Sequence, residues 1–269
     1  MGNVGMALML TLLAGLATGV GSLIAFFAKH TNTKFLSVSL GFSAGVMIYV
    51  SFVEIFQEAQ VSLEGILGLR MGTIVNVLAF FGGMLLILLI DKLIPEDKNP
   101  HEIKMVEEEN EPVKKVVNKA ALMRTGLFTA LAIAIHNFPE GLATFVSALQ
   151  APEIAYPIVI AIAIHNIPEG IAVSVPIYHA TGSKRKAFIY SFTSGLAEPL
   201  GAVVGYLILM PFMNEIMNSI IFSAVAGIMV FISLDELLPS AQEYGEHHLP
   251  IYGLVAGMIV MAVSLILFI

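Results

Sequence analysis

Apolar residues fill most of this chain in long runs, and polar residues gather in the short stretches between them. A membrane-spanning helix needs ~20 mostly apolar residues, and windows of that length find eight such segments. They cover residues 4–28, 35–58, 72–95, 121–149, 153–178, 186–211, 215–239 and 249–269. The pattern predicts an all-α integral membrane protein in a lipid bilayer, with eight transmembrane helices in one polytopic domain spanning residues 1–269.

The composition supports a membrane protein. Hydrophobic residues make up 57% of the chain, charged residues 12%, and the mean hydropathy is +0.88, whereas soluble domains are far more polar. One long connection, residues 96–119, carries clusters of both charges and is predicted to be a disordered or loosely helical linker. No basic stripe suggests a nucleic-acid partner.

The distribution of Lys and Arg predicts the orientation, because cytoplasmic loops carry an excess of these residues. Twelve of the thirteen lie in the first, third and fifth connections, and only Arg70 lies on the other side. We therefore expect both termini outside, the 96–119 linker in the cytoplasm, and the chain in the cytoplasmic (inner) membrane of the cell.

A decapeptide occurs twice, in neighbouring predicted helices. AIAIHNFPEG covers residues 132–141 and AIAIHNIPEG covers residues 161–170, with nine of ten positions identical. In each copy a histidine precedes a glutamate by four residues, so the two side chains share one helix face. The pairs are His136 with Glu140 and His165 with Glu169, and two such faces fit a metal ion.

Three carboxylates fall near the middle of predicted spans: Glu140, Glu169 and, in the sequence SGLAEPLGA, Glu198. A charge at this depth costs ~2.5–3.5 kcal/mol on insertion scales, so each such residue is a functional candidate. No Lys or Arg lies near the middle of any span. The three carboxylates must therefore be protonated or bind a cation in the core of the helix bundle.

Prolines accompany each of these glutamates. Pro139 and Pro168 have no N–H for the carbonyls four residues earlier, so each helix is expected to bend and expose an acceptor beside its His/Glu pair. Pro199 has the same effect on the carbonyl of Gly195. Discontinuous helices near the midplane are a recurring way in which transporters build ion sites.

Other polar residues leave alternatives open. Asn137 and Asn166 suit a metal ligand or an interhelical hydrogen bond equally well. Met47 lies on a stripe with Ser51 and Glu54, and the sequence alone favours packing over thioether ligation for it. Further candidates are ordinary solvated residues or cation-attracting groups: Glu54 and Glu58 at the outer end, Asp235 and Glu236 near the inner end, and His247 and His248 in a loop.

The motifs resemble those of the ZIP family (Zrt-, Irt-like proteins) of divalent metal transporters, in its bacterial ZupT-like branch. The resemblance rests on HNFPEG, HNIPEG, SGLAEPLGA and the sequence GFSAGVMIYVSFVEIF in the second span, and it extends over nearly the whole chain. It implies an elevator-type carrier in which helices one, four, five and six shift against two, three, seven and eight. It also implies a homodimer that moves metal toward the cytoplasm.

The resemblance further implies a metal-ligand set. One metal position takes His136, Glu140, His165 and Glu169, with Met47 beside it. A second position takes Asn137, Asn166 and Glu198, bridged by Glu140 and Glu169. Two features differ from many relatives: the third loop has only His101 where a histidine-rich segment is frequent, and residue 166 is Asn where some relatives carry an acid.

The predicted function is import of divalent transition-metal ions, with Zn²⁺ foremost and Fe²⁺, Mn²⁺, Co²⁺ and Cd²⁺ as further cargo. The ion is cargo, with no cofactor and no enzymatic activity expected. The chain has no cysteine, which argues against a site dedicated to Cu(I). Two alternatives are a metal-selective channel and a membrane-embedded metallohydrolase, although H-x-x-x-E differs from the H-E-x-x-H arrangement of zinc proteases. A P-loop sequence is lacking, so the chain by itself is not an ATP-driven pump.

Overall fold

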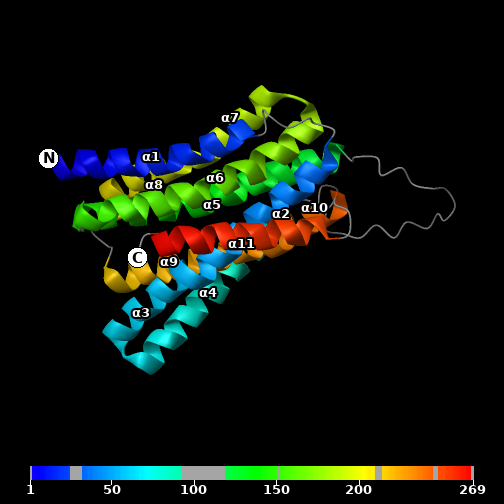
Figure 1. The fold of residues 1–269 in the computed structure, drawn as a ribbon. Helices are drawn as coiled ribbons and strands as arrows, with labels where there is room; N and C mark the ends of the chain where they lie inside the picture. Colours follow the sequence, from blue (N-terminus) through cyan, green and yellow to red (C-terminus); the bar gives the residue numbers. More distant parts are fainter. Residues whose placement is uncertain are drawn as a thin grey trace.

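The computed structural model describes residues 2–24, 32–92, 119–150, 152–209, 214–244 and 248–267. Within these ranges the chain is helical apart from short turns, and the long helices lie side by side in a bundle (Figure 1). The helices are α1 (Gly2–Ile24), α2 (Thr33–Val50), α3 (Phe56–Leu67), α4 (Leu69–Lys92), α5 (Lys119–Gln150), α6 (Pro152–Thr181), α7 (Lys184–Gly195), α8 (Ala197–Val204), α9 (Glu215–Ile232), α10 (Leu238–Tyr244) and α11 (Leu249–Leu267).

Short π-helical segments join some of these helices end to end. They are η1 (Ser51–Ile55) between α2 and α3, η3 (Gly205–Leu209) after α8, and η5 (Ser233–Leu237) between α9 and α10. In η1 and η5 the first residue is a serine whose hydroxyl donates to the carbonyl four residues earlier, that of Met47 at 2.6 Å and that of Met229 at 2.8 Å. Serine bonds of this kind compete with the regular helix ladder. The hydrophobic pattern does not distinguish π-helix from α-helix, so these segments were not foreseen.

Each predicted span coincides with one helix or one end-to-end stack of helices. The second span is longer than predicted, because α2, η1 and α3 continue to Leu67 through residues too polar for a hydropathy window. The seventh likewise continues to Tyr244. The sixth is interrupted at Leu196, beside the Gly195 carbonyl that Pro199 cannot reach, as predicted for this proline. Residues 93–118, which hold most of the predicted linker, lie outside the described residues.

Among the described residues, six helices or stacks are long and apolar enough to cross a membrane. They are Val4–Leu23, Thr33–Leu67, Leu69–Ile90, Lys184–Ile208, Glu215–Glu243 and Leu249–Ile266. The two motif-bearing helices, α5 with 32 residues and α6 with 30, also exceed the length of a span. The N-terminal end of α1 and the C-terminal end of α11 lie at the same end of the bundle (Figure 1). The eight-span count and the outside location of the termini stay predictions.

The helices pack as two sets. We call α1, α5, α6, α7 and α8 the motif set, and α2, α3, α4, α9, α10 and α11 the second set. Helices approach most closely at glycines, where an added Cβ would overlap the backbone of a neighbour: Gly21 against Ile167 and Gly170 against Thr18 in the motif set, Gly45 against Leu254 in the second set. Every described glycine with such an overlap meets a helix of its own set.

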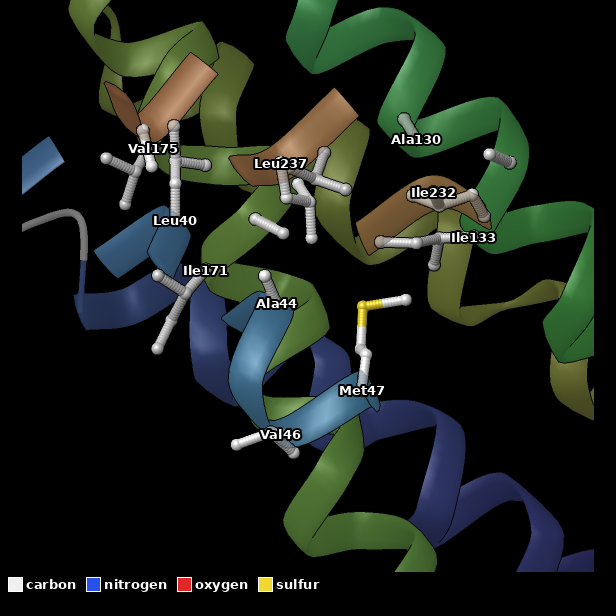
Figure 2. Close-up of a cluster of buried hydrophobic side chains, with 14 of the residues drawn as sticks. Leu40, Ala44, Val46, Met47, Ala130, Ile133, Ile171, Val175, Ile232 and Leu237 are labelled. Atoms are coloured by element: carbon white, nitrogen blue, oxygen red, sulfur yellow. The ribbon is translucent and has the colours of Figure 1, made fainter. Parts of the chain in front are cut away.

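Between the two sets the contact is mainly made by apolar side chains. One buried cluster includes Met47 of α2 and Ile232 of α9 from the second set, with Ile133 of α5 and Ile171 of α6 from the motif set (Figure 2). Backbone-to-backbone approach is thus characteristic of each set, whereas side chains form the boundary between them.

Candidate metal site

The two copies of the decapeptide lie on α5 and α6, which pack against each other. Both helices continue through Pro139 and Pro168 without a break, so the predicted bends stay predictions. α8 is pressed against α5 at two glycines: a Cβ on Gly141 would overlap the carbonyl of Glu198, and one on Gly201 would overlap that of Phe138. This approach brings Glu198 to the end of the first motif.

His136 of the first copy bonds to Glu169 of the second. Nε2 of His136 lies 2.7 Å from Oε1 of Glu169, and neither side chain is exposed to solvent. The sequence placed each histidine on a face with the glutamate of its own copy. The structure pairs residues of different copies, because α5 and α6 lie side by side.

Asn166 connects the second motif to Glu198. Its Nδ2 donates to Oε2 of Glu198 at 2.8 Å and to the carbonyl of Ala14 on α1 at 3.0 Å. The interhelical role that the sequence left open for Asn166 is therefore realised in this structure. Because only the amide nitrogen is used, its carbonyl oxygen is still available as a ligand.

Asn137 has a similar arrangement on α5. Its Nδ2 faces the carbonyl of Ser194 at 3.5 Å, a long contact, and its side chain is fully buried. Glu140 is also buried, and the carboxylate of Glu198 lies within electrostatic reach of both Glu140 and Glu169. The three buried carboxylates of Glu140, Glu169 and Glu198 thus all belong to the motif set.

Several oxygens of this group accept no hydrogen bond within the described part of the chain. They are Oδ1 of Asn137, Oδ1 of Asn166, Oε2 of Glu169 and Oε1 of Glu198. Buried polar atoms without a partner are rare in folded proteins, and all four are acceptors. The chemistry of these atoms fits a hard or borderline cation such as Zn²⁺, Fe²⁺ or Mn²⁺.

The ligand set is not gathered around one point. Among the described residues, no group of three or more His, Asp and Glu side chains is close enough to hold a metal. The side chain of His165 lies outside the described residues, so its predicted ligand role is untested. The His136–Glu169 bond occupies one nitrogen and one oxygen of the predicted ligand set, while Oε2 of Glu169 has no hydrogen-bond partner among the described residues.

Positive side chains are distant from the carboxylates along the chain. The described Lys and Arg residues occupy the first two turns or the last turn of their helices. The prediction that fixed cations are missing from the middle of the spans therefore agrees with the observed helix bounds.

Met47 is fully buried in the cluster that joins the two sets. Figure 2 shows its side chain directed from α2 towards Ile133 and Ile232. Ile133 lies about one turn before His136 on α5. This structure therefore gives Met47 the packing role that the sequence favoured, and its role as a metal ligand stays a prediction.

The remaining candidates lie away from this group. Glu54 belongs to η1, and Glu58 lines a small cavity with Ser62, Glu215 and Asn218 where α3 meets α9. Asp235 and Glu236 belong to η5, with Glu236 buried. His248 is exposed beside Tyr252. His101 and His247 lie outside the described residues.

Sequence reasoning missed several serines that bond between helices. The hydroxyl of Ser43 on α2 donates to the carbonyl of Pro168 at 2.6 Å. That of Ser191 on α7 lies 3.2 Å from the carbonyls of both Thr18 and Gly170. No signal in a single sequence separates these serines from the many others in the apolar helices.

Known proteins resemble this chain over nearly its whole length. Residues 95–265 match the family model described as ZIP Zinc transporter. The chain is 64% identical to the zinc transporter ZupT of Clostridium perfringens, with 100% of this chain and 98% of that protein aligned. It is 69% identical to the zinc transporter ZupT of Streptococcus mutans over 98% of this chain and 97% of that protein. A third relative, the zinc transporter ZupT of Lysinibacillus sphaericus, is 65% identical over 99% and 98%.

Proposed function

Since this chain belongs to the ZIP family of zinc transporters, we propose that it imports Zn²⁺ across the cytoplasmic membrane through the group of carboxylates and amides on α5, α6 and α8. The family identifies the chain as a transporter rather than an enzyme, so the metallohydrolase alternative is set aside.

The observation that carries this proposal is the charge of the buried group. Glu140, Glu169 and Glu198 are buried together, and the described Lys and Arg residues lie only near helix ends. Burial of an ionised carboxylate without a counter-charge costs roughly several kcal/mol in real proteins. A divalent cation removes most of this cost, so the cargo stabilises the group that binds it.

The proposed ligands are those that the resemblance to the family implies. His136, Glu140, His165 and Glu169 hold the first ion, with Met47 at its edge. Asn137, Asn166 and Glu198, with the two shared glutamates, provide a second position. Imidazole and carboxylate ligands also suit Fe²⁺, Mn²⁺, Co²⁺ and Cd²⁺, which we include as cargo.

Transport proceeds by movement of the motif set against the second set, as in an elevator-type carrier. This step is supported by the glycine contacts, which join helices within each set, and by the side-chain boundary between the sets. Side-chain contacts slide more readily than interlocked backbones. The proposal includes eight spans, both termini outside and a homodimer.

Zinc uptake into proteoliposomes tests the site. Glu169→Gln and Glu140→Gln are expected to reduce uptake at least tenfold, about the loss seen when metal-site groups are removed. The matched control is Glu64→Gln. The described hydrogen bonds of Glu64 come from Gln60 on α3 and Thr73 on α4, and neither residue belongs to the candidate site. Wild-type uptake by both site variants would refute the assignment.

Saturation of the same flux separates a carrier from a channel. A carrier that moves the motif set once per cycle has a slow, saturable turnover, because domain motions take microseconds to milliseconds or longer. A flux that rises without saturation with zinc concentration would favour the metal-selective channel.

A further inference from the structure

Ser43 makes a hydrogen bond across the boundary between the two sets. Its hydroxyl, on α2 of the second set, donates to the carbonyl of Pro168 on α6 of the motif set at 2.6 Å. Ser43 has no exposure to solvent, so water does not compete for this bond. The acceptor lies inside the second motif, directly before Glu169, and the donor lies one turn before Met47.

Thr125 and His179 also make hydrogen bonds between the two sets. The hydroxyls of Thr125 on α5 and Ser240 on α10 lie 3.4 Å apart. Nε2 of His179 on α6 lies 3.1 Å from the carbonyl of Asn32, which precedes α2. By their positions in these helices, the Thr125 and His179 bonds lie in the half of the bundle where α2 and α5 begin and α6 ends (Figure 1), the half that the Lys and Arg distribution assigns to the cytoplasm. The Ser43 bond lies closer to the middle of α6, next to Glu169.

The Ser43 bond is suited to repeated breaking and reforming. A displacement of α6 along α2 by about 2 Å lengthens the distance between the Ser43 hydroxyl and the Pro168 carbonyl beyond the usual hydrogen-bond range, which ends at about 3.2 Å. In that position the hydroxyl of Ser43 no longer contributes to the contact between the two sets.

We propose that Ser43 is a positioning residue that holds the second motif against α2 while the cytoplasmic half of the carrier is closed. The hydrogen bond fixes the height of the Pro168–Glu169 segment relative to α2. Loss of the bond favours displacement of the motif set and opens the cytoplasmic half. This inference rests on the carrier mechanism proposed above.

The expected size of the effect follows from one hydrogen bond. A single bond of this kind changes the ratio of two conformations by about two- to tenfold. The contribution acts on one conformation only, because the bond between Ser43 and Pro168 exists in that conformation alone.

The chain has no cysteine, which allows a direct measurement. In the double variant Thr125→Cys/Ser240→Cys, the two thiols replace hydroxyls that lie 3.4 Å apart across the boundary. The rate of disulfide formation with diamide, in membranes and without zinc, then reports the closed cytoplasmic half. In this background Ser43→Ala is expected to lower the rate about two- to tenfold.

Ser37→Ala is the matched control. Ser37 is also a fully buried serine of α2, and its hydroxyl donates to the carbonyl of Ala241 on α10 at 2.8 Å. That bond stays within the second set, so its loss should leave the crosslinking rate unchanged. An equal decrease in Ser37→Ala, or an unchanged rate in Ser43→Ala, would overturn the proposal.

A second pair of variants covers poor folding of Ser43→Ala. Thr and Val have nearly the same shape and differ by the hydroxyl, so Ser43→Thr should crosslink faster than Ser43→Val, and equal rates would refute the role of the hydroxyl. Because crosslinking needs no zinc, the two proposals fail separately. If the wild type takes up zinc and substitution of Ser43 leaves the crosslinking rate unchanged, only the positioning role is refuted. If the crosslinking rate depends on Ser43 but the wild type takes up no zinc, only the zinc function is refuted.

Discussion

His136 and Glu169 belong to different copies of one motif, and their side chains bond directly, with Nε2 2.7 Å from Oε1 and no solvent contact for either residue. Each copy thus supplies one half of the pair. A metal ion bound to Nε2 of His136 would displace this hydrogen bond.

Zinc binding is therefore expected to compete with protons. A zinc ion takes neutral imidazole and ionised carboxylate, so binding releases protons and the affinity falls as the pH is lowered. Calorimetry of the purified protein in two buffers of different ionisation enthalpy measures the number released. His136→Phe should change the number of protons released, because it removes one predicted ligand, while His248→Phe, at an exposed position, should leave that number unchanged. A pH-independent affinity would contradict the prediction.

Asn166→Asp should make folding depend on metal. Nδ2 of Asn166 donates to Oε2 of Glu198 at 2.8 Å, and an aspartate there places two buried carboxylates in contact. Loss of the bond and the new repulsion should destabilise the metal-free protein by about 3–5 kcal/mol, while zinc should raise its melting temperature more than that of wild type. Asn166→Ala is the control, because it loses the bond without the repulsion. A similar zinc-induced rise in both variants would refute this prediction.

Gly141→Ala should disrupt the packing of α5 on α8. A Cβ at residue 141 would overlap the carbonyl oxygen of Glu198, so one helix must shift, at a cost of about 1–3 kcal/mol. The displacement of Glu198 should also reduce zinc uptake. Gly82→Ala is the control, since a Cβ there meets no atom within 4 Å, and it should be neutral or stabilising. Thermal unfolding in detergent and uptake in liposomes measure both effects.

Met47→Leu separates packing from metal ligation. Met47 is buried among apolar side chains, so an apolar residue of similar volume should change stability by less than about 1.5 kcal/mol. If the thioether contacts the cargo, the variant should lose Cd²⁺ uptake more than Zn²⁺ uptake, because sulfur prefers the softer ion. Equal uptake ratios for wild type and Met47→Leu would assign Met47 to packing alone.

Much of the helical architecture follows from local properties of the sequence. The apolar runs predicted where the long helices lie, because in lipid a single segment can pair its own backbone N–H and C=O groups only as a helix. The break at Leu196 followed from the missing N–H of Pro199. The π-helical segments η1 and η5 could not be predicted. Each begins at a serine whose hydroxyl bonds to a carbonyl of its own helix, and a single sequence does not show which acceptor a serine uses.

The sequence suggested which residues belong to the candidate site, but it did not predict which of them bond to each other. The sequence identified His136, Glu169 and Glu198 from their depth and the lack of nearby Lys and Arg. It did not foresee that His136 pairs with Glu169, or that Ser43 reaches Pro168. Both contacts join helices whose relative height is set by packing.

By itself the sequence predicted which residues form the long apolar helices and which glutamates in them have no Lys or Arg nearby in the chain, because these depend on the hydropathy and charge of individual side chains. Only the tertiary structure decided which copy of the motif faces which, how Glu198 reaches them, and where the two sets meet. These depend on contacts such as those of Gly141 with Glu198 and Gly170 with Thr18, which arise only when helices far apart in the chain pack together.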